Sequence, residues 1–422
     1  MNGCPFHKTP PIGFDPYGEE YLNDPAAIYQ ETREEKPVFW YEPIGVWIVT
    51  KRKDIDSILM EPETWSCKAN GNNIEIPEKF QDILSSELMS KILIGMDAPD
   101  HTQARRVAQK GFMRPNMLAL APQIEQRANK ILDKLIAESK ALSSVEFLEG
   151  YCLELTTQTL MALMNLPPED EAMMRQLRDD FFKILASSRE PMVEPELSMV
   201  WDRYTKAHLH LRAIVKERRN SDALDIISVM SSAREPDGSP SLSVERIATH
   251  LTEFAAAGTD TTAQAMSNAI IFLSQHPEQC ELAKSNPDLW SKVFEETVRR
   301  RPSAPFASRT ATKNTHISGV EIPEGDIVWL ALASANTDSI TGSDLMNFDI
   351  TRENLNEQSH YSFTKGRHTC LGAPLGRTQG AIGLKVAYER LANLRLSPEN
   401  KSDFIPLAML PIRRSLYVTW DK

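Results

Sequence analysis

The stretch FTKGRHTCLG, residues 363–372, contains the cysteine that decides the chemistry expected of this chain. The sequence after it, PLGRTQGAIGLKVAYERLANL, has helical spacing, which places Cys370 just before a helix N-terminus. The helix dipole and the free amides of a first turn favour a thiolate over a thiol. Gly366 and Gly372 allow the backbone to turn tightly there. An isolated cysteine is more often a small buried apolar residue, but this loop suits a sulfur that ligates a metal.

The composition is that of a folded globular protein, with 41% hydrophobic and 25% charged residues. The net charge is −11, and a nucleic-acid-binding protein would normally show a basic excess, so we expect no nucleic-acid partner. No run of ~18 apolar residues occurs, so we expect no membrane span. The five cysteines are scattered without a CxxC pair, which predicts a reducing compartment and hence the cytoplasm.

Short strands are predicted near both ends of the chain. PVFWYEPIGVWIVT (37–50) predicts two strands, and THISGVEIPEGDIVWLAL (315–332) predicts another pair with Pro323–Gly325 as its turn. RRSLYVTW (413–420) predicts a last strand. No repeat or low-complexity linker divides the sequence, so we expect a single domain over residues 1–422.

Helical spacing dominates from about residue 100 to residue 300. In QIEQRANKILDKLIAES (123–139) it places an apolar stripe on one face. The stripe consists of Ile124, Ala128, Ile131, Leu132 and Leu135. The chain is therefore predicted to be mainly α with a minor β component.

The longest predicted helix runs from Ser243, which can cap it, to about Gln275, just before Pro277. Its middle, FAAAGTDTTAQ (254–264), is a poor helix sequence. Gly258 costs ~1 kcal/mol relative to alanine. The neighbouring threonine hydroxyls can bond to carbonyls four residues back and open the helix locally. A weak point in the centre of the longest helix suggests a functional reason for it.

Residues 363–372 resemble the haem-binding signature of the cytochrome P-450 family, Phe-x-x-Gly-x-His/Arg-x-Cys-x-Gly. The resemblance implies that Cys370 is the axial ligand of the iron of haem b. It also implies that the haem contacts Phe363, Gly366, His368 and Gly372. Thr364 stands where many members of the family have glycine.

The implied fold is a triangular helical domain with small β-sheets and a long central helix over the haem. In this sequence the β-rich part would cover about residues 1–65 and 310–335. The helical core would cover about residues 95–300, followed by the ligand loop at 363–372.

Two further segments resemble family motifs that bind the haem propionates. Asp97-Ala-Pro-Asp-His101-Thr-Gln-Ala-Arg105 is similar to Asp-Pro-Pro-x-His-x-x-x-Arg, and it places His101 and Arg105 on one helical face. Arg309, in SRTAT, corresponds to another propionate-binding arginine. Alone, the first pair would be read as an exposed surface feature.

The segment Ala257–Thr262 matches the family's oxygen-activation motif almost letter for letter. The resemblance implies that Ala257 and Gly258 lie against the haem. It implies that Asp260 and Thr261 are catalytic and deliver protons into a largely dry pocket, as a carboxyl beside a hydroxyl can do. Taken alone, the segment is a threonine-rich stretch tolerated in a buried helix.

Glu296-Thr-Val-Arg299 resembles the Glu-x-x-Arg motif of the family. Its usual partner is an arginine from a Phe-Asp-x-x-Arg segment, which here is Arg352. The resemblance implies a structural trio that supports the ligand loop. A buried carboxylate between two arginines must be fully bonded to be tolerated.

The implied activity is that of a monooxygenase. It would insert one oxygen atom of O2 into a small organic substrate by C–H hydroxylation or O-dealkylation. The sequence shows no flavin or nicotinamide domain, so electrons would come from a separate ferredoxin with its NAD(P)H-dependent reductase. A basic patch could attract an acidic donor, although it could equally be a solvated rim. The patch would consist of Arg105 or Arg106, Lys110, Arg114, Lys365, Arg367 and Arg377.

Two other functions stay open at this point. One is a haem-thiolate peroxygenase that uses peroxide directly, and the other is a non-catalytic haem-binding sensor or carrier. The intact Asp260–Thr261 pair argues against both.

The resemblance places the substrate pocket at about residues 68–94 and 250–261, with single residues from later segments. The individual pocket residues are Glu253, Phe254, Pro305, Phe306, Met409 and Leu410. Glu253 shares a helix face with Ala257 and Thr261. A carboxylate pointing into the pocket would favour a hydroxyl or amine on the substrate, so we hypothesise a small oxygenated aromatic. The alternative is that Glu253 turns aside to an internal cation.

Overall fold

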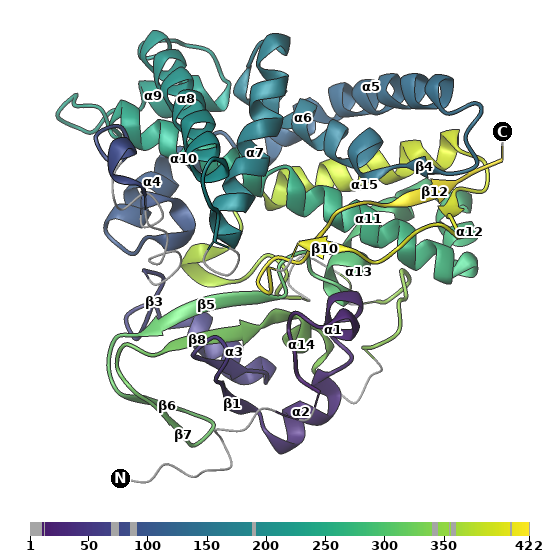
Figure 1. Cartoon of the computed structure of the whole chain (residues 1–422), viewed down its shortest axis with the longest axis horizontal. Coiled ribbons are helices and arrows are strands. Elements are labelled where there is room, and N and C mark those ends of the chain that lie inside the picture. Colours follow the sequence, from purple (N-terminus) through teal and green to yellow (C-terminus); the bar gives the residue numbers. More distant parts are fainter. Residues whose placement is uncertain are drawn as a thin grey trace.

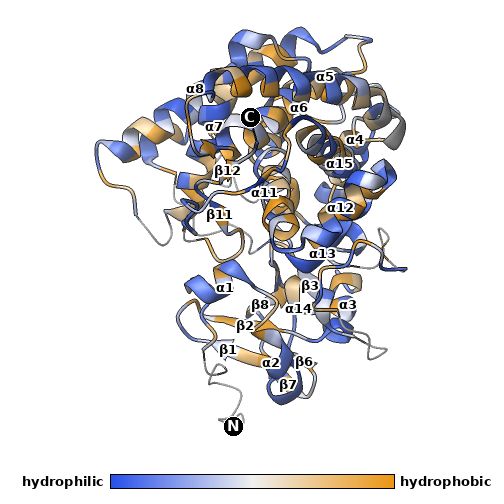
Figure 2. Cartoon of the chain, turned by 90° about the vertical axis from the view of Figure 1, so that its right-hand side faces the viewer, coloured by the Kyte–Doolittle hydropathy of each residue, from blue (hydrophilic) through white to orange (hydrophobic). Residues whose placement is uncertain are grey.

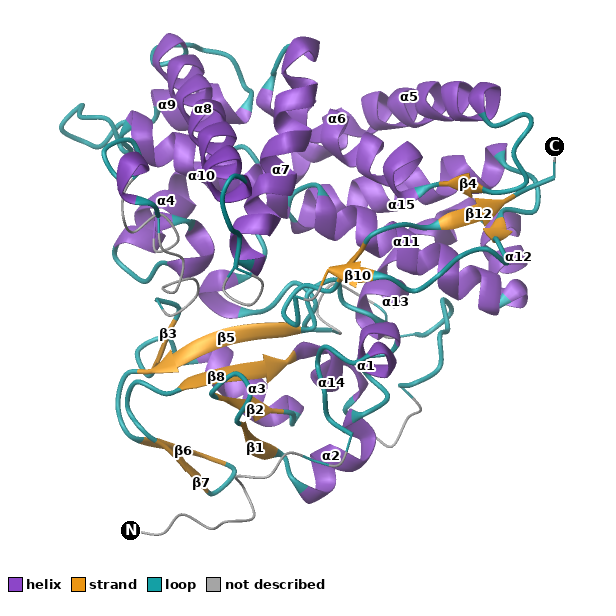
Figure 3. Ribbon diagram, in the orientation of Figure 1, coloured by secondary structure: helices purple, strands orange, loops and turns teal. Residues whose placement is uncertain are grey.

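The computed structural model describes residues 11, 13–68, 76–84, 91–187, 191–339, 345–353, 355, 360–405 and 407–421. Helices dominate these ranges, and the strands form small sheets (Figure 3). The predicted class, mainly α with a minor β component, is confirmed. Within the same ranges, no helix combines the length and the apolar character that a membrane crossing requires.

The largest sheet joins strands from distant parts of the chain. Its order is β1 (Val38–Tyr41), β2 (Val46–Val49), β8 (Ile327–Ala331), β5 (Phe306–Ala311) and β3 (Trp65–Ser66). The two strands predicted for residues 37–50 are confirmed as β1 and β2, which are antiparallel, whereas β2 runs parallel to β8. Short helices lie around this sheet in the lower half of Figure 1. They are α1 (Glu19–Asn23), α2 (Tyr29–Glu35), α3 (Arg52–Met60) and α14 (Leu332–Thr337).

The turn predicted at Pro323–Gly325 is wrong as a hairpin turn. The hairpin is formed by β6 (Thr315–Ile317) and β7 (Val320–Ile322) and turns at Ser318 and Gly319. Both turn residues have positive φ, 46° and 82°, which matches the tight turn preferred between twisted strands. Residues 323–325 instead lead to β8, which pairs with β2 and β5.

The single last strand predicted over residues 413–420 is also wrong. The segment is divided between β11 (Ile412–Arg413) and β12 (Tyr417–Thr419). β11 pairs with β10 (Phe404–Ile405), whereas β12 pairs with β4 (Val145–Glu146) and β9 (Arg395–Leu396). A residue pattern can favour an extended backbone, but it does not show with which strands the segment pairs or where each pairing ends.

The larger helices fill the upper half of Figure 1. They are α4 (Asp100–Gln109), α5 (Arg114–Glu138), α6 (Glu154–Met164), α7 (Glu171–Ala186), α8 (Glu196–Glu217), α9 (Ile226–Ser232), α12 (Pro277–Ser285), α13 (Trp290–Arg300) and α15 (Ala373–Arg390). A π-helical segment, η5 (Leu148–Leu153), precedes α6. The apolar stripe predicted in residues 123–139 is buried on α5, as expected.

The long central helix is present but interrupted. It consists of α10 (Val244–Ala257) and α11 (Asp260–Gln275), and Figure 2 shows α11 as a mostly hydrophobic element among the other helices. Ser243 caps α10 because its hydroxyl accepts a hydrogen bond from the Arg246 amide (3.0 Å). The interruption falls at Gly258 and Thr259, where the sequence predicts an opening.

Glycines on α15 allow that helix to pack closely against its neighbours. A Cβ at Gly380 would lie 2.2 Å from the Phe294 ring of α13, and one at Gly383 would lie 2.8 Å from Met266 Sδ of α11. Because glycine has no Cβ atom, the helices can approach each other closely at these positions. α15 is thereby fixed against α11 and α13, with its N-terminus just after the ligand loop.

Candidate active site

The loop before α15 is tightly turned. A 3-10 turn, η8 (Gly366–His368), precedes Cys370, whose amide donates to the Phe363 carbonyl (2.8 Å). Gly366 has φ +70°, and a Cβ there would lie 2.6 Å from the Leu59 carbonyl oxygen, so this position requires glycine. Thr364 adopts φ 55°, and its hydroxyl donates to the His368 carbonyl (2.6 Å).

Cys370 is exposed, and several neighbouring groups change the pKa of its thiol. The residue is exposed by surface area, yet protein atoms lie around the sulfur closely enough for desolvation to raise the pKa of the thiol. The amides of Gly372 and Ala373 and the guanidinium groups of Arg105 and Arg377 act to lower that pKa. A reachable sulfur with amide donors and nearby cations fits the thiolate ligand of a metal.

Basic side chains from separate elements converge beside this loop. The rings of His101, on α4, and His368, in η8, lie with their centroids 4.0 Å apart. Desolvation lowers the pKa of His368 to about 3, assisted by the positive charges of His101, Arg309, Arg105 and Arg367. His368 is therefore neutral at pH 7, and its imidazole N–H can donate a hydrogen bond to an anion beside the guanidinium groups. The donor set fits two carboxylates, as the haem propionates would supply.

A cavity of about 210 Å³ opens beside the rings of His101 and His368. Its walls include Asp97, His101, Arg367 and His368. Asp97 is already bonded, because its oxygens accept from the Ser66 hydroxyl (2.5 Å) and the Cys67 amide (2.9 Å). Arg367 pairs with Glu63 (3.2 Å), and the imidazoles of His101 and His368 also line the cavity as possible hydrogen-bond donors.

The helix opening carries the predicted oxygen-activation residues. Ala257 is exposed and Thr261 is half-buried, although Ala248–Ala256 before them are all buried. The Thr261 hydroxyl donates to the Ala257 carbonyl (2.8 Å), across the opening. A Cβ at Gly258 would lie 2.8 Å from the Phe254 carbonyl oxygen, so alanine would crowd this turn.

The opening lies next to the start of α15. A Cβ at Gly376 would be 3.3 Å from the Thr262 hydroxyl, which places the first turns of α11 and α15 in contact. The structure therefore brings the oxygen-activation segment close to the helix that follows the Cys370 loop.

Asp260 is a buried carboxyl with a raised pKa. Desolvation raises its pKa from 3.8 to about 6, although Arg178 and a hydrogen bond from Gln264 act to lower it. Gln264 Nε2 donates to Asp260 Oδ1 (3.2 Å), and Arg178 Nε lies 3.9 Å from Asp260 Oδ2. Such a carboxyl exchanges its proton near neutral pH.

Arg178 connects Asp260 to the surface. It is 4% exposed, and its guanidinium bonds to Asp179 (2.7 Å) and Glu149 (3.2 Å), whose side chains are half-exposed. Arg178 was not predicted, because it lies on α7 and no sequence spacing relates it to Asp260. Gln264 was not predicted either, although it stands at i+4 from Asp260 and could have been found by helical spacing.

The predicted supporting trio is assembled. Arg299 binds Glu296 through two hydrogen bonds (2.6 and 2.8 Å), and Arg352 Nη2 lies 3.4 Å from Glu296 Oε1. The Asp349 amide also donates to Glu296 (3.0 Å). Arg299 further donates to the Asn336 carbonyl (3.0 Å), so the trio joins α13 to α14 and to the segment around residue 350.

A second buried ionic cluster supports the ligand loop and was not predicted. Glu295 accepts hydrogen bonds from Arg377 and from His360 (2.8 Å). Desolvation acts to raise the Glu295 pKa, but these two partners outweigh it and hold the pKa below its usual value. The Arg377 guanidinium also lies 4.3 Å from the Phe363 ring centre. Its position near Cys370 is therefore fixed from two sides.

Glu253 does not present a free carboxylate. Its two oxygens accept hydrogen bonds from the amides of Leu93 (2.9 Å) and Ile94 (3.2 Å), in the 3-10 turn η4 (Leu93–Gly95). His250 Nδ1 lies 3.5 Å from the same carboxylate. Glu253 thus turns aside, as the alternative interpretation held, but mainly to backbone amides.

The other predicted pocket residues fall into two groups. Phe254 packs edge-on to Phe112 (5.5 Å between ring centres) within the core around α10. Phe306 stacks on Tyr21 (6.0 Å), and Met409 packs in the same cluster. Pro305 contributes its carbonyl to the Leu332 amide (2.8 Å). Leu410 packs with the group of Phe254. Residues 69–75 and 85–90 of the predicted pocket lie outside the described residues.

The predicted basic patch is largely neutralised. Acidic partners engage Arg106 (Glu235, 2.7 Å), Lys365 (Asp56, 3.1 Å), Arg367 (Glu63, 3.2 Å) and Arg377 (Glu295). Lys110 is exposed, and the side chain of Arg114 lies outside the described part of the chain. The acidic partners come from segments distant in sequence, so they were not visible when the patch was proposed, and they reduce its positive charge.

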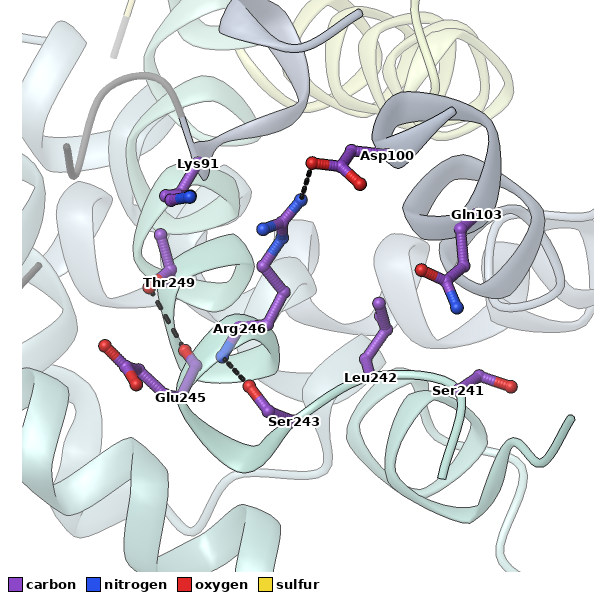
Figure 4. A pocket seen from close by; sticks show the side chains of 9 residues that line it. All are labelled: Lys91, Asp100, Gln103, Ser241, Leu242, Ser243, Glu245, Arg246 and Thr249. Atoms are coloured by element: carbon purple, nitrogen blue, oxygen red, sulfur yellow. Dashed lines mark hydrogen bonds and ion pairs between the residues drawn. The ribbon is translucent and has the colours of Figure 1, made fainter. Parts of the chain in front are cut away.

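A separate hydrophilic cavity of about 340 Å³ lies beside the start of α10 (Figure 4). Arg246 approaches Asp100 (4.0 Å) across it, and Lys91 and Glu245 also line it. Its charges are of both signs. None of its lining residues belongs to the cysteine loop or the helix opening.

Comparison with known proteins agrees with this geometry. The sequence model of the family "Cytochrome P450" matches residues 75–284 and 285–401 of this chain. "Cytochrome P450 CYP107DY1" of Priestia megaterium is 28% identical over 93% of this chain and 97% of its own length. "Putative cytochrome P450 YjiB" of Bacillus subtilis is 30% identical over 85% of each chain.

A solved structure of "cytochrome P450 CREJ in complex with (4-ethylphenyl) dihydrogen phosphate" superposes with a TM-score of 0.83. It is 26% identical and covers 97% of this chain and 99% of its own. The predicted cytochrome P-450 fold is thereby confirmed. The chain belongs to the cytochrome P450 family of haem-thiolate monooxygenases, whose cofactor is haem b.

Proposed function

We propose that this monooxygenase inserts one oxygen atom of O2 into a small, mainly apolar organic substrate, by C–H hydroxylation or O-dealkylation. The observation that carries the proposal is the Asp260–Thr261 pair, at a helix opening that lies beside the cysteine-loop helix. Bound haem would supply the dioxygen chemistry. Cys370 would be its ligand, and its carboxylates would be held by His101, Arg105, Arg309 and His368.

The protein's own part in this reaction is proton delivery. Asp260, with a pKa of about 6, holds a proton in a dry environment and can release it at neutral pH. Arg178 links it to the half-exposed carboxylates of Asp179 and Glu149, which can take protons from solvent. The half-buried Thr261 hydroxyl is the next group along the helix and can pass a proton towards the substrate side.

The substrate we propose is a small oxygenated aromatic. Glu253 no longer supports this choice, because its oxygens are bonded to the backbone. Support comes instead from the similar CREJ structure, which was solved in complex with (4-ethylphenyl) dihydrogen phosphate. Electrons would come from a separate ferredoxin with an NAD(P)H-dependent reductase. The described cysteines are all free, which supports a reducing compartment such as the cytoplasm.

Reconstitution of the holoprotein with a ferredoxin, its reductase and NAD(P)H tests the proposal. We expect substrate-dependent NAD(P)H consumption and one hydroxylated or dealkylated product per turnover. Product formed with peroxide but not with the ferredoxin system would instead establish a peroxygenase. Ligand binding without any product would favour a haem-binding sensor.

The cysteine assignment has a direct spectroscopic test. The reduced, carbon monoxide-treated protein should show the red-shifted Soret band of thiolate ligation, and Cys370→Ala should lack it. Cys280→Ala is the matched control, because Cys280 is a buried cysteine on α12. An unchanged band in Cys370→Ala would end the proposal.

A further inference from the structure

Arg413 is a buried guanidinium group that has no anion partner among the residues that the structure describes. It is 2% exposed, and its Nε atom is buried with no hydrogen-bond partner. Among the described residues, no carboxylate forms an ion pair with it and no acceptor bonds to its side chain. Its guanidinium carbon lies 4.6 Å from the Phe404 ring centre. Contact with one aromatic face does not replace the hydrogen bonds that a buried charge loses.

A second buried arginine lies against the same ring. Arg301 is 7% exposed, and its guanidinium carbon is 5.8 Å from the Phe404 ring centre. Burial and, to a smaller extent, the charge of Arg413 lower the pKa of Arg301 to about 9. Burial also lowers the pKa of Arg413, to about 10. The two cations are therefore close enough to repel each other in a poorly solvated region.

The nearby carboxylate is already engaged. Asp24 binds Arg300 through two hydrogen bonds (2.7 and 2.6 Å), and Arg301 donates to the Leu22 carbonyl. Asp24 therefore acts electrostatically on Arg300 and Arg301. Among the described residues, no acid pairs with Arg413. The cluster keeps a positive excess that an added anion would offset.

The cluster lies close to the groups expected to carry out the reaction. The Arg413 amide donates to Gln264 Oε1 (3.1 Å), and Gln264 Nε2 donates to the Arg413 carbonyl (3.1 Å). The same Nε2 also lies 3.2 Å from Asp260 Oδ1. The Gln264 side chain, on α11, therefore bonds both to the backbone of β11 and to Asp260.

Both arginines also flank segments expected to line the substrate pocket. Arg301 directly follows α13 and precedes Pro305 and Phe306, and Arg413 ends the β10–β11 pair that carries Met409. The haem-carboxylate set lies elsewhere, on α4, β5 and η8. The haem carboxylates would therefore not neutralise the positive charge at Arg413.

We propose that Arg413 and Arg301, on either side of the Phe404 ring, form a recognition site for the oxyanion of the substrate, a carboxylate or a phosphate monoester. Guanidinium groups bind both anions through paired hydrogen bonds, and a buried site strengthens each bond. This inference rests on the proposed monooxygenase function and narrows it, because the substrate would be an amphipathic anion and not a neutral aromatic.

Calorimetric titration of the holoprotein with three matched probes tests the site. The probes are 4-butylbenzoate, 4-butylphenyl phosphate and the neutral 4-butylbenzamide. We expect the wild type to bind at least one anion more tightly than the amide, and the preferred anion identifies the oxyanion. Arg413→Met should weaken anion binding at least tenfold and leave amide binding within twofold, whereas Arg413→Lys should recover part of the loss.

Arg414→Met is the matched control, because Arg414 is the exposed neighbour that pairs with Asp403 (3.5 Å). It should bind all three probes as the wild type does. Equal affinity of the wild type for amide and anions, or no binding of either anion, would overturn the site. Equal weakening of all probes in Arg413→Met, with a lower unfolding temperature, would assign the residue a structural role. Binding is read without turnover, so failure of the monooxygenase reaction would be seen separately.

Discussion

At the scale of single residues, Asp260 shows how burial creates a functional group. Its carboxyl is 3% exposed, and desolvation raises its pKa to about 6 in spite of Arg178 and Gln264. In the unfolded chain the same carboxyl would titrate near its usual value of 3.8. The folded protein therefore binds this proton more tightly than the unfolded chain, and the difference makes stability depend on pH.

Asp260→Asn should stabilise the protein at neutral pH while lowering its turnover. Because the folded pKa is raised, the ionised carboxyl destabilises the fold above about pH 6, by about 3 kcal/mol at ~1.4 kcal/mol per pKa unit. This penalty shrinks as the pH falls from 6 towards 4. Turnover should fall ~10²-fold, the usual loss on removing a general acid. Denaturant unfolding of wild type and variant at pH 7 and pH 5 measures the effect.

Asp179→Asn is the comparison for this prediction, since the Asp179 side chain is half-exposed. It should change stability by less than ~1 kcal/mol. A stability difference between wild type and Asp260→Asn that stays constant from pH 7 to pH 5 would contradict the raised pKa.

At the scale of secondary structure elements, small residues decide how closely the helices approach each other. The α10–α11 helix opens at Gly258, where a side chain would meet the Phe254 carbonyl at 2.8 Å. On α15, Gly376, Gly380 and Gly383 form a face towards α11 and α13. Because α15 carries the ligand loop at its start, its packing determines where Cys370 lies.

Gly380→Ala should destabilise the protein by about 1–3 kcal/mol, the usual range for overpacking a core. The added Cβ would lie 2.2 Å from two atoms of the rigid Phe294 ring, so α13 and α15 must move apart. Urea unfolding and haem retention measure the change. In Gly376→Ala the nearest atom is the Thr262 hydroxyl at 3.3 Å, so the loss should be much smaller. Equal stability of the two variants would contradict this account of the packing.

At the scale of the whole molecule, acidic residues near the ligand loop limit its positive charge. Arg367 pairs with Glu63 (3.2 Å) and Lys365 with Asp56 (3.1 Å), and both acids come from the N-terminal part of the chain. An acidic electron donor would therefore meet a weaker attraction than the positions of the basic residues suggest.

Neutralising the acids in the double variant Asp56→Asn, Glu63→Gln should speed association with an acidic ferredoxin severalfold at low ionic strength. Released Lys365 and Arg367 would attract the donor, and the gain should disappear at high salt because exposed charges are screened. Stopped-flow reduction of the holoprotein by the ferredoxin at several salt concentrations measures the association rate. Glu281→Gln is the control, since Glu281 is an exposed acid on α12. An unchanged or slower rate at low salt would show that the donor does not use this surface.

The fold was predictable where the evidence lies in local pattern. The stripe of Ile124 and Leu132 predicts the buried face of α5, and Gly258 among threonines predicts the opening of the central helix. The partners of strands were not predictable. The pairing of β8 with β2 depends on residues far apart in the chain, and the hairpin turn moved to Ser318–Gly319 because both residues adopt positive φ.

The candidate site divides in the same way. Cys370, His101 and Asp260 stand in short motifs whose spacing can be read directly. The clusters around them were not foreseen, namely Arg178 with Asp260, and His360 and Arg377 with Glu295. Glu253 had the right helix face for a pocket residue, but the fold brings the Leu93 and Ile94 amides within reach of its carboxylate.

The sequence by itself determined the family, the cysteine ligand expected for the haem and the weak point of the central helix, because each depends on residue types at short spacing. Only the tertiary structure decided which charges are paired, which carboxyl has a raised pKa and which arginine stays without an anion. The reason is physical: hydrogen bonds, Coulomb interactions and desolvation depend on distance in space, and folding brings together groups that the sequence keeps far apart.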